Sequence, residues 1–341
     1  MAEDKVSILG AGSWGTSLAI HLARKGYTPF LWSHRKEQVE EIKSTGRNIA
    51  YLPNVLIPES ILISDDLEMS VRDATAVISA VPSHAFRDVL ASCHRYFSPS
   101  TIIINAAKGI DENSLQRISE IFTEVSGGSS DNYVVLSGPS HAEEVSIGMP
   151  TAVVVASGSD KNALKAQDIL MSVDFRVYTN SDVTGVELGG ALKNIIALGT
   201  GISDGLGFGD NTKAALMTRG LAEITRLGMA GGANPLTFAG LAGLGDLIVT
   251  CTSMHSRNRR AGIEIGKGKS PTEALESVRM VVEGFRTTRA AYKLSRKHNV
   301  EMPITAEIYR VLYEGGSARE AVFNLMGRGK RNEMEETGFN F

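Results

Sequence analysis

The chain has few of the residues that mark secreted, metal-binding, membrane or nucleic-acid-binding proteins. Its two cysteines, Cys93 and Cys251, are too few for a disulfide framework, and no spacing of Cys or His is typical of a metal site. The 35 Lys and Arg residues are outnumbered by 38 Asp and Glu, and a net charge of −3 argues against a nucleic-acid partner. No signal-peptide pattern and no membrane-length apolar run occurs. We therefore expect a cytoplasmic protein with no metal, no nucleic-acid partner and no membrane insertion.

The residues that are present favour a folded protein with real cores. Of the 341 residues, 43% are hydrophobic, which is typical of globular chains. At roughly 150 residues per domain, this length predicts about two domains.

A glycine-rich loop near the N-terminus predicts a dinucleotide site. A short apolar run ending at Leu9 is followed by Gly10-Ala11-Gly12-Ser13-Trp14-Gly15 and then by a helix-like stretch. Gly10 permits a tight turn, Gly12 lets the backbone approach a pyrophosphate, and Gly15 lets the helix pack closely on the strand. The helix N-terminus offers N–H groups and a partial positive charge to the phosphates. This order of strand, loop and helix makes redox chemistry the first hypothesis.

The chain lacks the acidic residue that holds the ribose hydroxyls of NAD, which normally stands about 20 residues further on. The second predicted strand, over 28–32, is followed by His34, Arg35 and Lys36 instead. Because guanidinium pairs well with phosphate oxygens, this tip suits a ribose phosphate. We therefore expect NADPH to be favoured, with NADH possible. The alternative is that Arg35 and Lys36 are only the solvated start of a helix.

Strand-like and helix-like segments alternate in the first half of the chain. Short apolar runs rich in β-branched residues predict buried parallel strands, so we expect a doubly wound, Rossmann-like α/β domain over 1–181. From about Asp182 helical periodicity takes over, and we expect an all-α domain over 182–341. The final stretch from Gly327, which contains Arg328, Lys330 and Arg331, indicates a mobile tail. The expected strands are 5–9, 28–32, 76–80, 101–105, 133–136 and 151–155, and the expected helices include 85–96, 115–125 and a long helix through 186–198.

Three polar loops follow predicted strands of this sheet. They cover 81–84, 106–109 and 137–143. Ligands of such sheets bind beyond the carboxyl ends of the strands, so we expect all three loops on the cofactor side.

Two charged residues stand in apolar, glycine-containing stretches of the second half. Lys193 follows Gly189-Gly190-Ala191-Leu192. It either extends to the surface or is desolvated, which would lower its pKa and suit it to acid–base catalysis. Asp246 is the only charge within 240–247. It caps the following helix or pairs with Lys193, and the two roles are compatible. The paired glycines inside a helix indicate close backbone packing.

Further charges favour contact with a ligand. Lys108 follows a predicted strand on the ligand side. The run Ser256-Arg257-Asn258-Arg259-Arg260 is a candidate phosphate clamp, although such a basic run is more often a solvated face. Glu283 ends an apolar run, where it either accepts hydrogen bonds from a carboxamide or ribose or only begins the next helix.

Together these segments resemble the bacterial NAD(P)-dependent glycerol-3-phosphate dehydrogenases over nearly the whole chain. The resemblance rests on motifs that occur in one order, at 10–16, 107–109, 137–142, 189–194, 243–247, 256–260 and 282–284. It implies reversible reduction of dihydroxyacetone phosphate to sn-glycerol 3-phosphate, which supplies the glycerophospholipid backbone, and it implies a homodimer. Ser140 stands where the family often has Thr, and Trp14 stands where Tyr or Trp varies; neither departure is expected to change function.

The resemblance also implies roles for particular residues. Lys193 looks like the general acid/base, and we expect Asp246 to orient it while Arg257 holds the substrate phosphate. The cofactor contacts, with the loop glycines included, are Gly10, Gly12, Ser13, Trp14, Gly15, His34, Arg35, Lys108, Ala142, Arg257, Val281 and Glu283. The substrate contacts are Lys108, Gly138, Ser140, Lys193, Asp246, Ser256, Arg257 and Asn258.

Two other functions fit parts of the sequence. A hydroxyacid or phosphogluconate dehydrogenase shares the architecture, but the arginine cluster together with the Asp246 loop disfavours it. A dinucleotide-binding redox sensor needs only the Gly10 loop, and it has no use for Lys193, Asp246 and Arg257 in one polar cluster.

Overall fold

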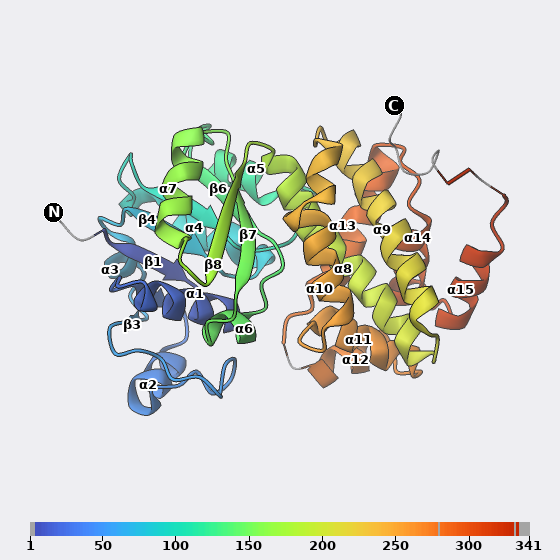
Figure 1. The fold of residues 1–341 in the computed structure, drawn as a ribbon, viewed down its shortest axis with the longest axis horizontal. Coiled ribbons are helices and arrows are strands. Elements are labelled where there is room, and N and C mark those ends of the chain that lie inside the picture. The colour runs from blue at the N-terminus through green and yellow to red at the C-terminus, as the bar shows by residue number, and fades with distance from the viewer. Residues whose placement is uncertain (1–3, 279, 331, 334–341) are drawn as a thin grey trace. The chain divides into compact units, whose positions relative to one another are not determined.

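The computed structural model describes residues 4–278, 280–330 and 332–333, and within them the chain forms two compact units (Figure 1). The first unit contains the chain up to Ala107 together with Ile118–Val183. The second contains Lys108–Arg117 together with the chain from Thr184 onward. A short segment from the first half of the sequence is thus part of the second unit.

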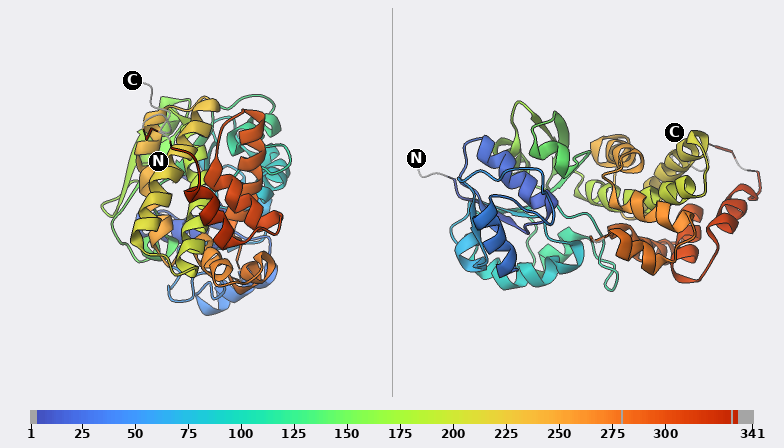
Figure 2. Two further views of the ribbon diagram at one scale, coloured as in Figure 1. Left: turned by 90° about the vertical axis from the view of Figure 1, so that its right-hand side faces the viewer. Right: turned by 90° about the horizontal axis from the view of Figure 1, so that it is seen from below.

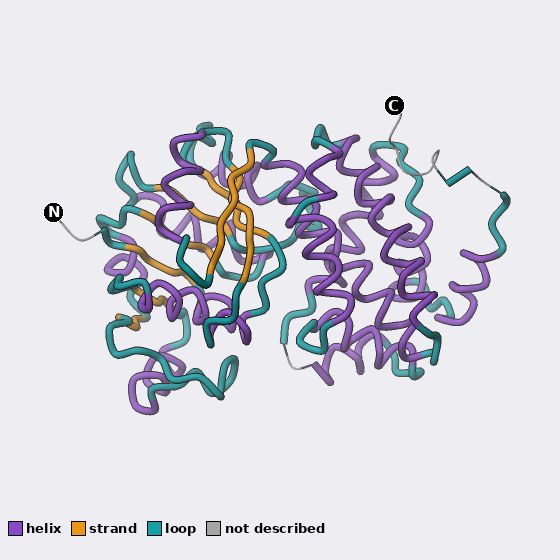
Figure 3. The backbone as a smooth tube through the Cα atoms, in the orientation of Figure 1, coloured by secondary structure: helices purple, strands orange, loops and turns teal. Residues whose placement is uncertain are grey.

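An eight-stranded sheet forms the centre of the first unit, in the order β3-β2-β1-β4-β5-β6-β7-β8. Every neighbouring pair is parallel except β6 and β7, which are antiparallel. Within the described residues strands occur in this unit alone (Figure 3). The strands are β1 (Val6–Leu9), β2 (Phe30–Trp32), β3 (Leu62–Ser64), β4 (Ala76–Ser79), β5 (Ile102–Asn105), β6 (Tyr133–Ser137), β7 (Thr151–Ala156) and β8 (Phe175–Asn180).

The central strands confirm the predicted parallel core. β1, β4, β5 and β6 are buried along their whole lengths, which explains why their sequences are continuous apolar runs. The prediction that all the strands are parallel was wrong for β7, which lies antiparallel to β6. An apolar run carries no direction, and direction depends on the connection, here the short helix α6 (Ala142–Ser146).

Two strands were missed because their sequences carry weak signals. β3 has three residues, lies at the end of the sheet and exposes Leu62. In β8, Phe175 and Val177 are buried while the residues after each are exposed, so this strand lacks a continuous apolar run.

Helices connect the strands of this unit. The predicted helix over 85–96 is confirmed as three consecutive segments, η1, α4 and η2. The helix predicted over 115–125 begins later, at Ile118, because the residues before it belong to the second unit. The helices are α1 (Ser13–Arg24), α2 (Lys36–Thr45), α3 (Leu67–Val71), η1 (Ser83–Ala85), α4 (Phe86–Cys93), η2 (His94–Tyr96), α5 (Ile118–Val125), α6 and α7 (Asp160–Leu170).

Apart from the segment Lys108–Arg117 and the connecting loops, the second unit is helical in its described residues, as predicted, and Figure 2 gives two further views of its helices. The long predicted helix is present as α8 (Val183–Gly205), which is buried from Gly185 to Ser203 and supplies much of the apolar core. The other elements are α9 (Asp210–Ala230), η3 (Pro235–Ala239), η4 (Leu241–Gly245), α10 (Asp246–Thr252), α11 (Arg257–Gly266), α12 (Pro271–Val278), α13 (Glu283–Lys297), α14 (Pro303–Tyr313) and α15 (Ala318–Met326).

Two further observations concern the described residues only. None of their helices combines the length and apolar character needed to cross a membrane. In the stretch expected to form a tail, Arg328 pairs with Glu301 at 2.6 Å, and Arg331 lies outside the described residues.

Candidate functional site

The glycine loop after β1 has the geometry expected of a phosphate-binding turn. Gly10 has φ +106°, and its N–H donates to the Trp32 carbonyl at 3.0 Å. A Cβ at Gly15 would collide with the Gly10 carbonyl oxygen, so this glycine is what lets α1 pack against the loop. Gly12 precedes the first residue of α1 without a side-chain cap, and a Cβ there would meet nothing within 4 Å. The loop therefore fits a pyrophosphate at the N-terminus of α1.

The strand register brings the other candidate cofactor loops to the same edge of the sheet. Leu9 pairs with Trp32 on one side and with Ser79 on the other, and β5 and β6 continue the parallel order. The loops after β4, β5 and β6 therefore begin on the cofactor side, as predicted. α6 packs against α1. The candidate residues of the first unit at this edge are Gly10, Gly12, Ser13, Trp14, Gly15, His34, Arg35, Gly138, Ser140 and Ala142.

The tip of β2 presents cationic groups. His34 is exposed, and Arg35 stands just before the first residue of α2. The Arg35 guanidinium lies 5.4 Å from the ring centroid of Tyr51, with its Nη2 3.4 Å from the Tyr51 hydroxyl. No ion pair between Arg35 and a carboxylate is found in the described part of the chain. A partly exposed guanidinium in this place is open to an anionic group.

Two lysines meet one aspartate inside the second unit. Lys193 Nζ lies 2.5 Å from Asp246 Oδ1, and Lys108 Nζ lies 2.6 Å from Asp246 Oδ2. Lys193 also donates to the Thr250 hydroxyl at 2.6 Å, and that hydroxyl donates to the Asp246 carbonyl. Lys193 and Asp246 are 5% and 1% exposed, so Lys193 does not extend to the surface. The sequence-based pairing of Asp246 with Lys193 is present.

Burial and the shared carboxylate set the protonation of this cluster. Burial lowers the pKa of Lys193 to about 8, and repulsion by Lys108 contributes to the decrease while Asp246 opposes it. Burial alone would raise the pKa of Asp246, but the two ammonium groups outweigh it and the net pKa is lowered. Asp246 is therefore a carboxylate at neutral pH, and Lys193 holds a proton that it can release.

The expectation that Asp246 caps a helix was wrong. Asp246 is the first residue of α10, Gly245 stands before it, and its carboxylate holds the lysines instead. The turn before it, η4, is π-helical, with Gly245 N–H donating to the Gly240 carbonyl. A Cβ at Gly189 would lie 2.7 Å from the Ala242 oxygen in this turn. The close backbone packing predicted at the paired glycines is therefore present at Gly189.

The polar run 256–260 is divided among several structural roles. Ser256 caps α11 by accepting from the Arg259 N–H, and the Arg259 guanidinium pairs with Asp204 at 2.8 Å. Asn258 donates to Asn194 Oδ1 at 2.8 Å and accepts from the Gly284 N–H at 2.8 Å. This arrangement joins α11 to α8, which carries Lys193, and to α13.

Other candidate residues lie near the start of α13. The Arg257 Nη1 is 3.5 Å from the carbonyl oxygen of Val281, which is itself 40% exposed. Glu283 is the first residue of α13. The candidate residues of the second unit are thus Lys108, Lys193, Asp246, Ser256, Arg257, Asn258, Val281 and Glu283.

Two residues of the cluster were not assigned a role from sequence. Thr250 lies one helical turn after Asp246, a spacing that places both on one helix face and could have indicated it. Asn194 directly follows Lys193 at the end of the motif 189–194, but nothing in the sequence indicates its hydrogen bond with Asn258.

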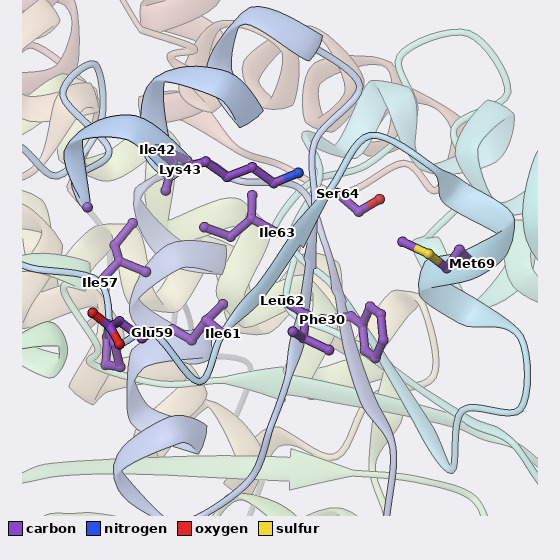
Figure 4. Close-up of a pocket in the computed structure, with 12 residues that line it drawn as sticks. Phe30, Ile42, Lys43, Ile57, Glu59, Ile61, Leu62, Ile63, Ser64 and Met69 are labelled. Carbon is purple, nitrogen blue, oxygen red and sulfur yellow. The ribbon is translucent and has the colours of Figure 1, made fainter.

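An apolar hollow of about 610 Å³ lies elsewhere in the first unit (Figure 4). It is lined from β2, β3, α2 and neighbouring segments, with Phe30, Leu62 and Met69 among its walls. None of the candidate site residues lines it. Among the described residues no group of three or more His, Cys, Asp or Glu side chains gathers to hold a metal ion.

Comparison with known proteins matches almost the whole chain to one family. Residues 5–163 match the family described as NAD-dependent glycerol-3-phosphate dehydrogenase N-terminus, and residues 182–323 match its C-terminus. The glycerol-3-phosphate dehydrogenase of Pelotomaculum thermopropionicum, described as using NAD(P)+, is 63% identical over 335 residues, which cover 98% of this chain and 96% of that protein. Its counterpart in Thermoanaerobacter sp. strain X514 is 59% identical over 330 residues, or 97% and 99% of the two chains.

A solved structure agrees with these matches. The crystal structure of glycerol-3-phosphate dehydrogenase from Coxiella burnetii is 41% identical, has a TM-score of 0.91, and covers 96% of this chain and 99% of that chain. The resemblance inferred from the motifs is confirmed: the chain belongs to the NAD-dependent glycerol-3-phosphate dehydrogenase family.

Proposed function

We propose that the chain carries out the reaction of its family with Lys193 as the general acid and base. That reaction is the reversible, nicotinamide-dependent reduction of dihydroxyacetone phosphate to sn-glycerol 3-phosphate. The observation that carries the assignment is a buried lysine, 2.5 Å from a buried carboxylate, whose pKa is lowered to about 8. A pKa near the working pH lets one group donate and recover a proton efficiently.

The nicotinamide cofactor, when bound, supplies or accepts the hydride. Lys193 Nζ donates its proton to the carbonyl oxygen of the substrate as negative charge develops there, and it takes the proton back in the oxidation of the alcohol. Asp246 and Thr250 receive two of the ammonium N–H bonds and so fix where the third points. The protein thereby holds the proton in a defined direction before the reaction starts.

The charge balance of the cluster suits a phosphorylated ketone. Two ammonium groups share one carboxylate, so the cluster keeps one net positive charge. We assign Lys108 and Arg257 to contacts with the substrate phosphate or its neighbouring oxygens, with Ser256 and Asn258 beside them. Charge-assisted hydrogen bonds to a dianion are about twice as strong as neutral ones. Unphosphorylated dihydroxyacetone should therefore be a far poorer substrate.

The glycine loop and the tip of β2 support a preference for NADPH. The assigned contacts are Gly10, Gly12, Ser13, Trp14, Gly15, Ala142, Val281 and Glu283 for the dinucleotide as a whole, and His34 and Arg35 for the ribose phosphate. Gly138 and Ser140 are assigned to the substrate. The preference rests on Arg35, which stands where an acid would favour NADH.

Activity of Lys193 variants tests the proposal. Lys193→Ala should lower turnover about 100-fold or more while the affinity for NADPH stays nearly unchanged, because proton transfer is lost and the dinucleotide loop is untouched. Lys193→Met fills the same volume without charge and separates loss of chemistry from loss of packing. Loss of NADPH absorbance with dihydroxyacetone phosphate measures turnover, and quenching of NADPH fluorescence measures binding. Near-normal turnover in either variant would refute the assignment.

Three broader expectations from the resemblance are also part of this proposal. We propose a homodimer, a cytoplasmic location and a role in supplying glycerophospholipid synthesis. Sedimentation equilibrium tests the first, and fractionation of cells tests the second. Restored growth without glycerol, in a bacterial strain that lacks this activity, tests the third.

A further inference from the structure

We infer that residues 108–117, here called the strap, are anchored on the helical unit so that Lys108 is positioned against Asp246, with Glu112, Arg117 and Glu187 acting as positioning residues. The inference rests on the proposed roles of Lys108 and Lys193. It concerns how one of their charges is held in place.

The strap is closed by its own hydrogen bonds. Ile110 and Arg117 form an isolated antiparallel bridge, and the Asp111 N–H donates to the Gln116 carbonyl at 3.0 Å. The Asp111 carboxylate accepts from the Ser114 N–H at 2.7 Å and from the Asn113 N–H at 3.1 Å. The segment is therefore a compact loop that can move only as a piece.

Apolar contacts fix this loop to the helical unit. Ile110 is 2% exposed and belongs to the same core as Leu192 and Ile195 of α8. Leu115, which has φ +62°, is partly buried against that core. Burial of these side chains favours the docked loop, because removing apolar surface from water is favourable.

Ion pairs also hold the strap against the helices. Arg117 Nη1 lies 2.8 Å from Glu187 Oε2, and Glu187 is a 6% exposed residue of α8, the helix that carries Lys193. Glu112 pairs with Arg286 at 2.9 Å and with Arg289 at 3.4 Å, both on α13. Because one partner of the first pair is buried, that pair should hold the strap more firmly than surface pairs do.

The anchoring of the strap fixes the backbone position of Lys108. A lysine side chain loses rotamer entropy when it is held in one geometry, so a firmly placed backbone is needed to keep Lys108 against Asp246. The groups that face Lys193 are Asp246 and Thr250, with charge from Lys108 and a contribution from Cys251. The position of Lys108 therefore determines its proposed contact with the substrate. It also contributes to the lowered pKa of Lys193.

Releasing the strap should move Lys108 away from Asp246 and weaken its repulsion of Lys193. The pKa of Lys193 should then rise, because the attraction by Asp246 remains while the opposing charge is reduced. A loss of packing alone would not produce an upward change of this kind. The pH profile of turnover therefore distinguishes positioning of Lys108 from a merely structural role.

The test uses Arg117→Met, which removes the ion pair with buried Glu187, and Glu112→Gln, which weakens the ion pairs with α13. Glu301→Gln is the matched control, because it removes a carboxylate that pairs with Arg328 in the same unit. Each change is also made in a Lys108→Met background. We expect Arg117→Met to lower kcat/KM about tenfold and to shift the pH midpoint of kcat upward, with a smaller change for Glu112→Gln. In the Lys108→Met background neither change should have a further effect.

The outcomes separate this inference from the proposed function. Full activity of Lys108→Met would refute the proposed role of Lys108 itself. An impaired Lys108→Met, beside strap variants that match Glu301→Gln in activity and pH midpoint, would overturn the strap inference and leave the role of Lys108 standing. Losses that add fully in the double variants would also overturn it. If Arg117→Met fails to fold, Glu112→Gln, which removes a half-exposed ion pair, decides the question by the same readouts.

Discussion

Replacing Glu223 by Gln should change how the stability of the helical unit depends on pH. Glu223 lies on α9 and is 1% exposed. Its carboxylate accepts from the Ile304 N–H at 2.6 Å and from the Thr305 N–H at 3.1 Å. It thereby satisfies N–H groups in the first turn of α14, where the preceding residue, Met302, provides no side-chain cap. One buried acid thus joins two helices through a helix terminus.

The magnitude follows from the pKa of this carboxyl group. Burial raises the pKa of Glu223 from 4.5 to about 7, although the hydrogen bonds from Ile304 and Thr305 and the charge of Arg226 oppose the increase. The folded state therefore binds the proton more tightly than the unfolded state. Its contribution to stability is fully present below about pH 4.5 and is lost as the pH rises through about 7. At ~1.4 kcal/mol per pKa unit, the complete loss between these two pKa values is about 3.5 kcal/mol.

The assay is urea unfolding followed by circular dichroism, at pH values from 5 to 8. The difference in unfolding free energy between Glu223→Gln and the unchanged protein should move by about 2.5 kcal/mol toward the variant across this range. Glu264→Gln is the control, because Glu264 is paired with Lys267 and Lys269 and its pKa is lowered from 4.5, so it does not titrate in this window. Parallel pH curves for Glu223→Gln and the unchanged protein would refute the reasoning.

Three further outcomes are expected. Gly189→Ala gains about 1 kcal/mol of helix propensity, but its Cβ would press on the Ala242 oxygen in the turn before Asp246. We therefore expect a lower kcat in steady-state assays. Gly209→Ala is the control, because a Cβ at Gly209 would meet nothing within 4 Å. Arg35→Ser should raise the KM for NADPH about tenfold and leave that for NADH nearly unchanged. Asp246→Asn leaves Lys193 facing Lys108 without a carboxylate, so turnover should fall about 100-fold and its pH midpoint should move downward.

The first unit was largely predictable because its signals are local. The Gly10 loop, the apolar run before it and the helix after it are adjacent in sequence, and their chemistry dictates a strand, a tight turn and a helix terminus. β4, β5 and β6 were predicted for the same reason, since strands buried on both faces need continuous apolar residues. Direction and edge position are not local, which is why the orientation of β7 and the presence of β3 and β8 were not obtained.

The second unit was predictable as helical but not in its contacts. The periodicity around Lys193 identifies α8, yet it does not show that a segment before Ile118 docks onto that helix. The helix predicted to begin at residue 115 begins at Ile118 instead. The preceding segment is held elsewhere, because Ile110 and Leu115 pack in a core formed by residues far along the chain. A few apolar residues in a polar loop could be buried in the core of either unit. The sequence does not show which core buries them, and the structure does.

The polar cluster shows what a sequence can and cannot say about a buried charge. Asp246 is separated from Lys193 by 53 positions and from Lys108 by 138, so no local pattern joins the three. A carboxylate 1% exposed would nevertheless cost several kcal/mol without partners of opposite charge. An aspartate in an apolar, glycine-rich stretch therefore requires cations, and lysines in similar surroundings are the natural candidates. The sequence predicts that such a pairing exists; the second lysine, and the loop that delivers it, follow only from the fold.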